Sequence, residues 1–137
     1  MKWLFVDTSA WYALIDAKEP NHSNVLHSLQ QYQNNLLTSN YIADETITLL
    51  RYRLGWQYAQ QFGEQLFSGQ LAQYVQITES DEKAAWERFG HYHDKMFSFT
   101  DCTSFVLMKR LELSIAITLD DDFKSFGFHC FPYKKRS

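Results

Sequence analysis

Four acidic residues of this 137-residue sequence could together bind a metal ion: Asp7, Glu45, Asp101 and Asp120. Asp7 and Asp120 each end a short apolar run, whereas Glu45 and Asp101 lie near the starts of expected helices. Carboxylates that share a pocket repel each other, by about 4 kcal/mol for a pair about 4 Å apart at an intermediate effective dielectric. Such a cluster needs protons or divalent cations, and its oxygen-only ligands suit magnesium or manganese. The chemistry that this arrangement indicates is metal-assisted hydrolysis of a phosphodiester bond.

Hydroxyl side chains lie within two residues of three of these acids. They could orient water or a phosphate group by hydrogen bonds, and we expect them to bind substrate; they are Thr8, Ser9, Thr100 and Thr118.

Each acid also has a simpler structural explanation. Asp101 can be the N-cap of its helix, with Thr100 as the rival cap, because both residue types are common at that position. Asp7 can be a helix cap, and Glu45 can be an exposed residue on the flank of its helix. Asp120 can be part of a solvated turn at residues 120–122. Asp121 and Asp122 are expected to lie in that turn.

The elements that must position these residues alternate between strand and helix patterns. Apolar runs predict strands at residues 2–6, 36–39, 73–77, 114–119 and 128–133. Helical periodicity predicts helices at residues 10–17, 21–34, 41–54, 56–67, 79–94 and 98–113, with Asn40 as the cap of the third. The alternation indicates an α/β sandwich with a mainly parallel central sheet and helices on both faces. Because the carboxyl ends of neighbouring parallel strands open onto one crevice, Asp7 and Asp120 are expected to share a pocket.

Length and composition are those of one domain, expected to span residues 1–137. The sequence is 45% hydrophobic and 17% aromatic, enough for a sizeable core. It contains no apolar run near the roughly 20 residues of a membrane span, and a cytoplasmic location is expected. Cys102 and Cys130 show no zinc-binding spacing and are interpreted as core thiols.

The net charge of −3 does not by itself indicate a nucleic-acid-binding protein. Whole-chain charge can nevertheless hide an acidic pocket beside basic groups. The basic cluster near the C-terminus is a candidate for phosphate contacts outside the pocket: Lys134, Lys135 and Arg136. Five other cations are weaker candidates, for which a solvated charge is the simpler interpretation: Arg51, Arg53, Lys95, Lys109 and Arg110.

Taken together, four motifs resemble, in order and spacing, the acidic motifs of PIN-domain ribonucleases. They are residues 6–10 (VDTSA), 43–45 (ADE), 98–102 (SFTDC) and 116–123 (AITLDDDF), and the resemblance covers nearly the whole chain. The greatest similarity is to VapC-type toxins and their stand-alone relatives. The resemblance implies a parallel sheet of about five strands with flanking helices, and magnesium- or manganese-dependent endonucleolytic cleavage of RNA.

The resemblance also implies roles for single residues. The residues that match the metal-binding and catalytic quartet are Asp7, Glu45, Asp101 and Asp120, and Thr8 and Ser9 match the hydroxyl positions beside the first acid. Asp122 aligns as an extra acid of the last motif, and Asp44 competes weakly with Glu45.

Partners are expected from the resemblance alone. VapC-type proteins typically pair with a small antitoxin and commonly form dimers, so an antitoxin and a homodimer are expected here. The helix at residues 56–67 is a candidate interface, although its apolar residues could equally be core. The alternative function is a catalytically inactive PIN-like module that binds RNA or a protein.

Overall fold

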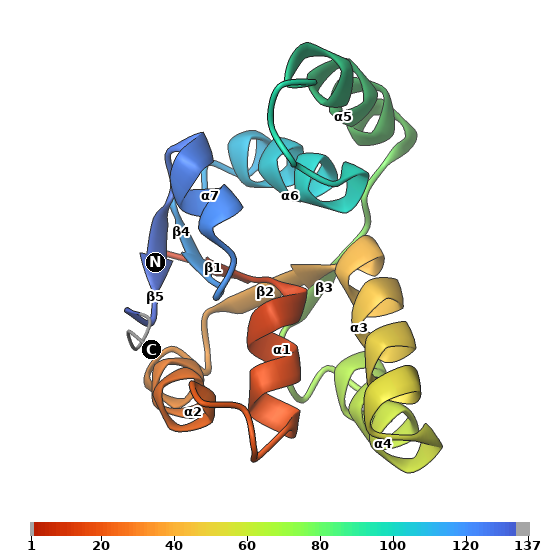
Figure 1. Cartoon of the computed structure of the whole chain (residues 1–137), viewed down its shortest axis with the longest axis vertical. Coiled ribbons are helices and arrows are strands. Elements are labelled where there is room, and N and C mark those ends of the chain that lie inside the picture. The colour runs from red at the N-terminus through yellow and green to blue at the C-terminus, as the bar shows by residue number, and fades with distance from the viewer. Residues whose placement is uncertain (1, 134–137) are drawn as a thin grey trace.

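The computed structural model describes residues 2–133 of the chain. Its centre is a sheet in which every pair of neighbouring strands is parallel. From edge to edge the five strands are β3 (Gln73–Val75), β2 (Leu36–Ser39), β1 (Leu4–Val6), β4 (Ile115–Ile117) and β5 (His129–Phe131) (Figure 1). This order confirms the expected parallel sheet of about five strands.

The phosphate contact predicted for the basic cluster stays a prediction, because the cluster lies outside the described residues: Lys134, Lys135 and Arg136.

The helices form two further layers, one on each side of the sheet. One layer holds α1 (Thr8–Ile15), α2 (His22–Gln31), α3 (Asn40–Arg53) and α4 (Trp56–Phe67), and the other holds α5 (Glu79–His91), α6 (Phe99–Arg110) and α7 (Asp121–Phe126) (Figure 1). The chain runs outward from β1 to β2 and β3, then returns past β1 to β4 and β5. Right-handed crossovers therefore place the later helices on the opposite face. Within the described part of the chain, no helix combines the length and apolarity that crossing a membrane requires.

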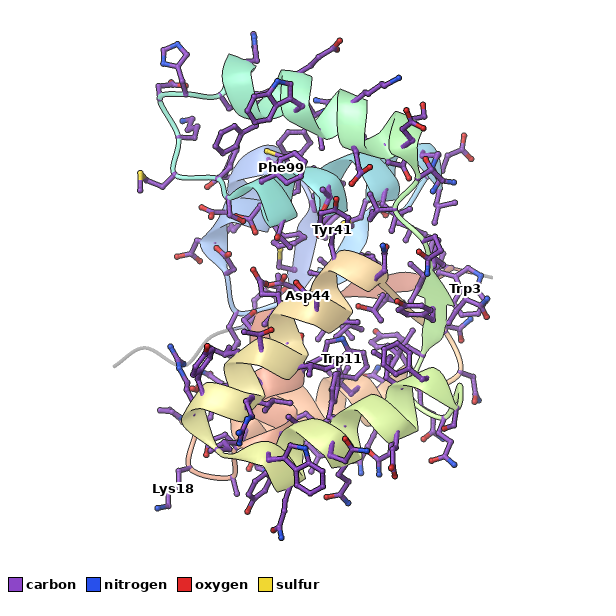
Figure 2. All side chains as sticks on the ribbon, turned by 90° about the vertical axis from the view of Figure 1, so that its right-hand side faces the viewer. Trp3, Trp11, Lys18, Tyr41, Asp44 and Phe99 are labelled. Carbon is purple, nitrogen blue, oxygen red and sulfur yellow. The ribbon has the colours of Figure 1, made fainter. Side chains whose placement is uncertain are left out.

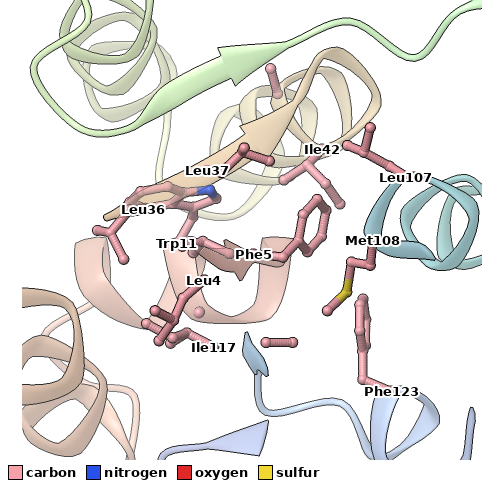
Figure 3. Packing of buried hydrophobic residues seen from close by; sticks show 14 of the residues in the cluster. Leu4, Phe5, Trp11, Leu36, Leu37, Ile42, Leu107, Met108, Ile117 and Phe123 are labelled. Atoms are coloured by element: carbon pink, nitrogen blue, oxygen red, sulfur yellow. The ribbon is translucent and has the colours of Figure 1, made fainter. Parts of the chain in front are cut away.

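The core packs against both faces of the central strands (Figure 3). On the α7 side, the rings of Phe5 and Phe123 stack with their centroids 6.1 Å apart. On the α1 side, the indole N–H of Trp11 donates to Thr38 Oγ1 at 3.3 Å, and that hydroxyl donates to the Val6 carbonyl at 2.9 Å. These contacts join the carboxyl-terminal halves of β1 and β2, and the segments that carry Asp7 and Glu45 follow these strands.

The start of α3 differs from the expected one. Its N-cap is Ser39 rather than Asn40, since the Ile42 N–H donates to Ser39 Oγ at 3.1 Å. Ser39 ends β2 with extended backbone, which is the conformation that an N-cap requires. Asn40 instead accepts a hydrogen bond from the Ile77 N–H at 2.6 Å and so ties α3 to the segment after β3.

Candidate active site

The carboxyl ends of β1 and β4 border a cavity of about 720 Å³. These strands are neighbours in the sheet, and the chain leaves them toward opposite faces through α1 and α7 (Figure 1). Ligand crevices of parallel sheets form at such a switch point. The structure brings to this cavity all the acids of the predicted quartet and the extra acid of the last motif: Asp7, Glu45, Asp101, Asp120 and Asp122.

Asp7 follows β1 directly and is only 4% exposed. Its Oδ2 accepts hydrogen bonds from Thr118 Oγ1 at 3.0 Å and from Ser9 Oγ at 3.1 Å. Burial raises the pKa of Asp7 to about 6, assisted by the charges of Glu45 and Asp120 and opposed by the two hydroxyl groups. Asp7 is thus a carboxylate that two hydrogen bonds hold in one orientation, in surroundings that disfavour its negative charge.

The hydroxyl groups of Ser9 and Thr118 join the ends of β1 and β4. They lie 3.1 Å apart, and they accept hydrogen bonds from the Leu119 N–H at 2.8 Å and the Asp120 N–H at 2.9 Å, respectively. Thr118 is 2% exposed and is not part of the cavity lining. In this structure its hydroxyl orients Asp7 and the backbone before Asp120, whereas Ser9 also lines the cavity.

The other two predicted hydroxyls have different surroundings. Thr8 lines the cavity and accepts a hydrogen bond from Thr46 Oγ1 at 3.1 Å, which ties α1 to α3. Thr100 does not line the cavity, and its carbonyl accepts from Thr103 Oγ1 at 2.7 Å. Substrate binding by these hydroxyls stays a prediction.

Asp101 lies at the start of α6 but is not its N-cap. The cap is Ser98, whose hydroxyl accepts from the Asp101 N–H at 2.9 Å, while Asp101 Oδ2 accepts from the Ser98 N–H at 3.1 Å. This reciprocal pair of hydrogen bonds is a capping box. The prediction that Asp101 or Thr100 is the cap is therefore wrong, because the cap is Ser98. The box holds the Asp101 carboxylate at the helix start.

Asp101 is also part of a close acidic cluster. One carboxylate oxygen from each of Asp101, Asp120 and Asp122 lies within 4.8 Å of the others. Burial raises the pKa of Asp101, and the charges of Asp120 and Asp7 raise it further, against the hydrogen bond from Ser98. Asp122, which was expected only as an extra acid within a turn, is therefore a member of this acidic cluster. It lies in the first turn of α7, where its N–H donates to Asp120 Oδ1 at 2.9 Å, so the solvated turn expected for Asp121 and Asp122 is a helix start.

On α3, Glu45 rather than Asp44 faces the cavity. Asp44 is exposed, and Figure 2 shows its position on the outer part of the helix. Glu45, Leu49 and Arg53 line the cavity at a spacing of four residues, the helical repeat of one face. Sequence reasoning could have found the last two from this spacing alone.

The donor set fits a hard divalent cation. It consists of carboxylate oxygens from several elements, and burial together with the neighbouring negative charges raises the pKa values of Asp7 and Asp101. A cation relieves that repulsion, and oxygen ligands are those that magnesium and manganese prefer. Other lining residues come from loops and had no sequence signal that singled them out: Glu19, Asn21 and Met96.

The family model for the PIN domain matches residues 4–129. The chain is a PIN-domain protein. The 23S rRNA-specific endonuclease VapC20 of Mycobacterium tuberculosis is 32% identical over 125 residues, which are 91% of this chain and 95% of that protein. The PIN-domain chain is therefore of the VapC type.

Solved structures agree with this assignment. The crystal structure of M. tuberculosis VapC20, described as a Sarcin-Ricin loop cleaving toxin, superposes with a TM-score of 0.86 at 30% identity, covering 91% of this chain and 95% of that one. DNA-bound VapBC from Salmonella typhimurium has a TM-score of 0.71 at 11% identity, covering 96% and 98% of the two chains, and shows the shared fold. PIN nucleases generally use a divalent metal, and this PIN-domain chain has the matching acidic cluster.

Proposed function

We propose that this PIN-domain protein is an endoribonuclease that hydrolyses RNA phosphodiester bonds with magnesium or manganese. The observation that carries the proposal is the convergence of the acidic residues on one cavity: Asp7, Glu45, Asp101, Asp120 and Asp122. The similarity to a 23S rRNA-specific endonuclease over 91% of the chain supports RNA as the substrate class.

The chain's own groups prepare the site for this chemistry. A bound divalent cation supplies Lewis acidity and lowers the pKa of a water ligand. Asp101, Asp120 and Asp122, whose carboxylate oxygens lie within 4.8 Å of one another, would hold such a cation, and Asp7 and Glu45 line the same cavity. Thr118 and Ser9 keep Asp7 in one orientation, and the capping box does the same for Asp101. Because Asp101 must lose its proton to bind a cation, metal binding strengthens as pH rises.

We further propose that the protein is the toxin of a type II pair and binds a small antitoxin. The VapBC neighbour and the toxin description of VapC20 support this role. A homodimer is part of the same proposal. The predicted interface helix, α4, buries Phe62 and Leu66 but leaves Trp56 57% and Phe67 59% exposed. A groove of about 550 Å³ between α3 and α4 is thus available to a protein partner.

Residues 1–137 are proposed to act as a single domain. The cytoplasmic location expected from the sequence belongs to this proposal, because RNA is the proposed substrate.

The test is cleavage of purified ribosomal RNA with magnesium, with manganese and with chelator. Wild type should cut only when metal is present, and Asp7→Asn should lose at least about a hundredfold in rate, the usual scale for a lost transition-state contact. Wild type that binds RNA without cutting it in either metal would support the alternative of an inactive binding module. An Asp7→Asn variant as fast as wild type would show that Asp7 is not a metal ligand.

A further inference from the structure

Arg53 lies at the end of the cavity-facing stripe of α3. Glu45, Leu49 and Arg53 all line the cavity, and the separation of eight positions between Glu45 and Arg53 corresponds to about 12 Å along the helix. Arg53 is the one cation among the described residues that line this cavity. A positive group therefore lines the acidic cavity, two helical turns beyond Glu45 on α3.

The guanidinium group of Arg53 is supported by Tyr12 of α1. Its Cζ lies 5.3 Å from the centroid of the Tyr12 ring, a distance at which a cation is attracted to the aromatic face. Tyr12 is itself held, since its hydroxyl donates to Asp16 Oδ2 at 2.8 Å. Tyr12 also lines the cavity, so the pair presents a pre-oriented guanidinium to whatever enters.

Among residues 2–133, no acid forms an ion pair with Arg53. Within residues 2–133 the ion pairs are Lys83 with Glu79 and Arg110 with Asp81, and neither includes Arg53. Arg110 shows the contrast, because Asp81 occupies its guanidinium with two hydrogen bonds of 2.9 and 2.8 Å. Arg53 is exposed and interacts with both the ring and the hydroxyl group of Tyr12, but a guanidinium has five N–H donors, more than this contact uses.

We propose that Arg53, carried on the Tyr12 ring, binds a phosphate of single-stranded RNA that flanks the phosphate being hydrolysed. This inference rests on the proposed function. An acidic cavity repels the RNA backbone unless a cation offsets the repulsion, and a guanidinium fork matches phosphate oxygens in two parallel hydrogen bonds. The separation from Glu45 along α3 places the contact away from the reacting phosphate, so Arg53 acts in binding and positioning.

The experiment compares Arg53→Gln with a matched control, Arg51→Gln. Arg51 is on the same helix but lines the groove with α4 instead of the acidic cavity. The first readout is KM and kcat for an RNA oligonucleotide that contains the cleaved site. The second is binding of a mixed-sequence single-stranded oligoribonucleotide in chelator over a salt series, which needs no catalysis.

Arg53→Gln should raise KM about tenfold, as expected for one lost charge-assisted contact, with kcat within about threefold of wild type. The slope of log affinity against log salt should fall by about 0.7, the value for one phosphate contact on a single strand. Arg53→Lys should recover part of the affinity because it keeps the charge without the fork. Tyr12→Leu should act in the same direction as Arg53→Gln because it removes the supporting ring, and Arg51→Gln should match wild type.

Equal salt slopes and equal KM values for the Arg53→Gln and Arg51→Gln variants would overturn the inference. Arg53 would then be available to bind a carboxylate of a protein partner instead of RNA. A fall in kcat with unchanged KM would also overturn it, because Arg53 would then act on the reacting phosphate. If wild type cuts no RNA, the proposed function fails, while the binding measurements in chelator still decide the role of Arg53.

Discussion

The Thr118 hydroxyl donates a hydrogen bond of 3.0 Å to the Asp7 carboxylate, although 111 residues separate them in the chain. This bond joins the ends of neighbouring strands and opposes the effect of burial on the Asp7 pKa. A buried carboxylate is costly without such donors. Thr118 therefore matters to the site even though it is not exposed in the cavity.

Replacing Thr118 by Val removes this donor and keeps the shape of the side chain. A hydrogen bond to a charged group contributes about 1.5–3 kcal/mol. Its loss should destabilise the ionised form of Asp7 by about this amount and so raise the Asp7 pKa by about one unit or more. Manganese affinity at pH 7, measured by calorimetry, should fall about twofold for a one-unit rise in this pKa and about tenfold for a two-unit rise, because Asp7 binds the ion only when it is ionised. The control is Thr103→Val, because the Thr103 hydroxyl is also buried but bonds the Thr100 carbonyl. Equal affinity losses in both variants would mean that Thr118 has no specific effect on Asp7.

Glu45 and Asp44 are neighbours on α3 with different surroundings. Only Glu45 lines the cavity, whereas Asp44 is exposed. Glu45→Gln should lower kcat/KM for RNA by about a hundredfold if it helps to hold the cation, while Asp44→Asn should stay within about twofold. The measurement is cleavage at saturating and limiting manganese. Comparable losses in the two variants would remove Glu45 from the predicted quartet.

The raised pKa of Asp101 predicts how metal-free stability depends on pH. Its folded-state pKa of about 8 lies above the ordinary value of 3.8 for an aspartate, so its favourable contribution to stability is complete below about pH 4 and is lost as pH rises toward 8. Asp101→Asn removes the charge and keeps an oxygen that can accept from the Ser98 N–H. In chelator at pH 7 the variant should be more stable than wild type, with the gap closing toward pH 4. Urea unfolding at several pH values measures this difference.

Asp81 provides a control for Asp101, because it lies in an equivalent position but its pKa is shifted in the opposite direction. It occupies the same capping-box position in α5 that Asp101 occupies in α6. Burial alone raises the Asp81 pKa, but hydrogen bonds from Arg110 and Thr78 lower it overall. Asp81→Asn should therefore be less stable than wild type at pH 7, and the loss should shrink as pH falls below the unfolded pKa. If both Asn variants lose stability at pH 7, Asp101 serves α6 only as part of its capping box.

Metal should reverse the order of wild type and Asp101→Asn. A ligand that binds only the folded state stabilises by about 2.7 kcal/mol at one hundred times its dissociation constant. Wild type should gain about this amount from manganese in thermal or urea unfolding, and the variant, which lacks one ligand, should gain much less. Equal gains would mean that Asp101 does not hold the cation.

Much of the fold could be predicted from local sequence pattern. Apolar runs such as residues 36–39 and 115–117 are buried strands, and the acids that follow strands were correctly expected at the carboxyl edge of a parallel sheet. Helix α4 has the predicted bounds, Trp56–Phe67. Periodicity and strand ends are visible in sequence because they depend on residues close together in the chain.

Tertiary structure decided what depends on distances between remote residues. The β1–β4 pairing puts Thr118 against Asp7, the first turn of α7 brings Asp122 within 4.8 Å of Asp101 and Asp120, and packing of α3 on α1 places Arg53 over Tyr12. Single helix caps were also misjudged, because the choice between adjacent cap residues depends on where the preceding extended segment ends. The acids of the site were thus evident from sequence order, whereas their orientation, protonation and partners arise from sheet order and side-chain packing.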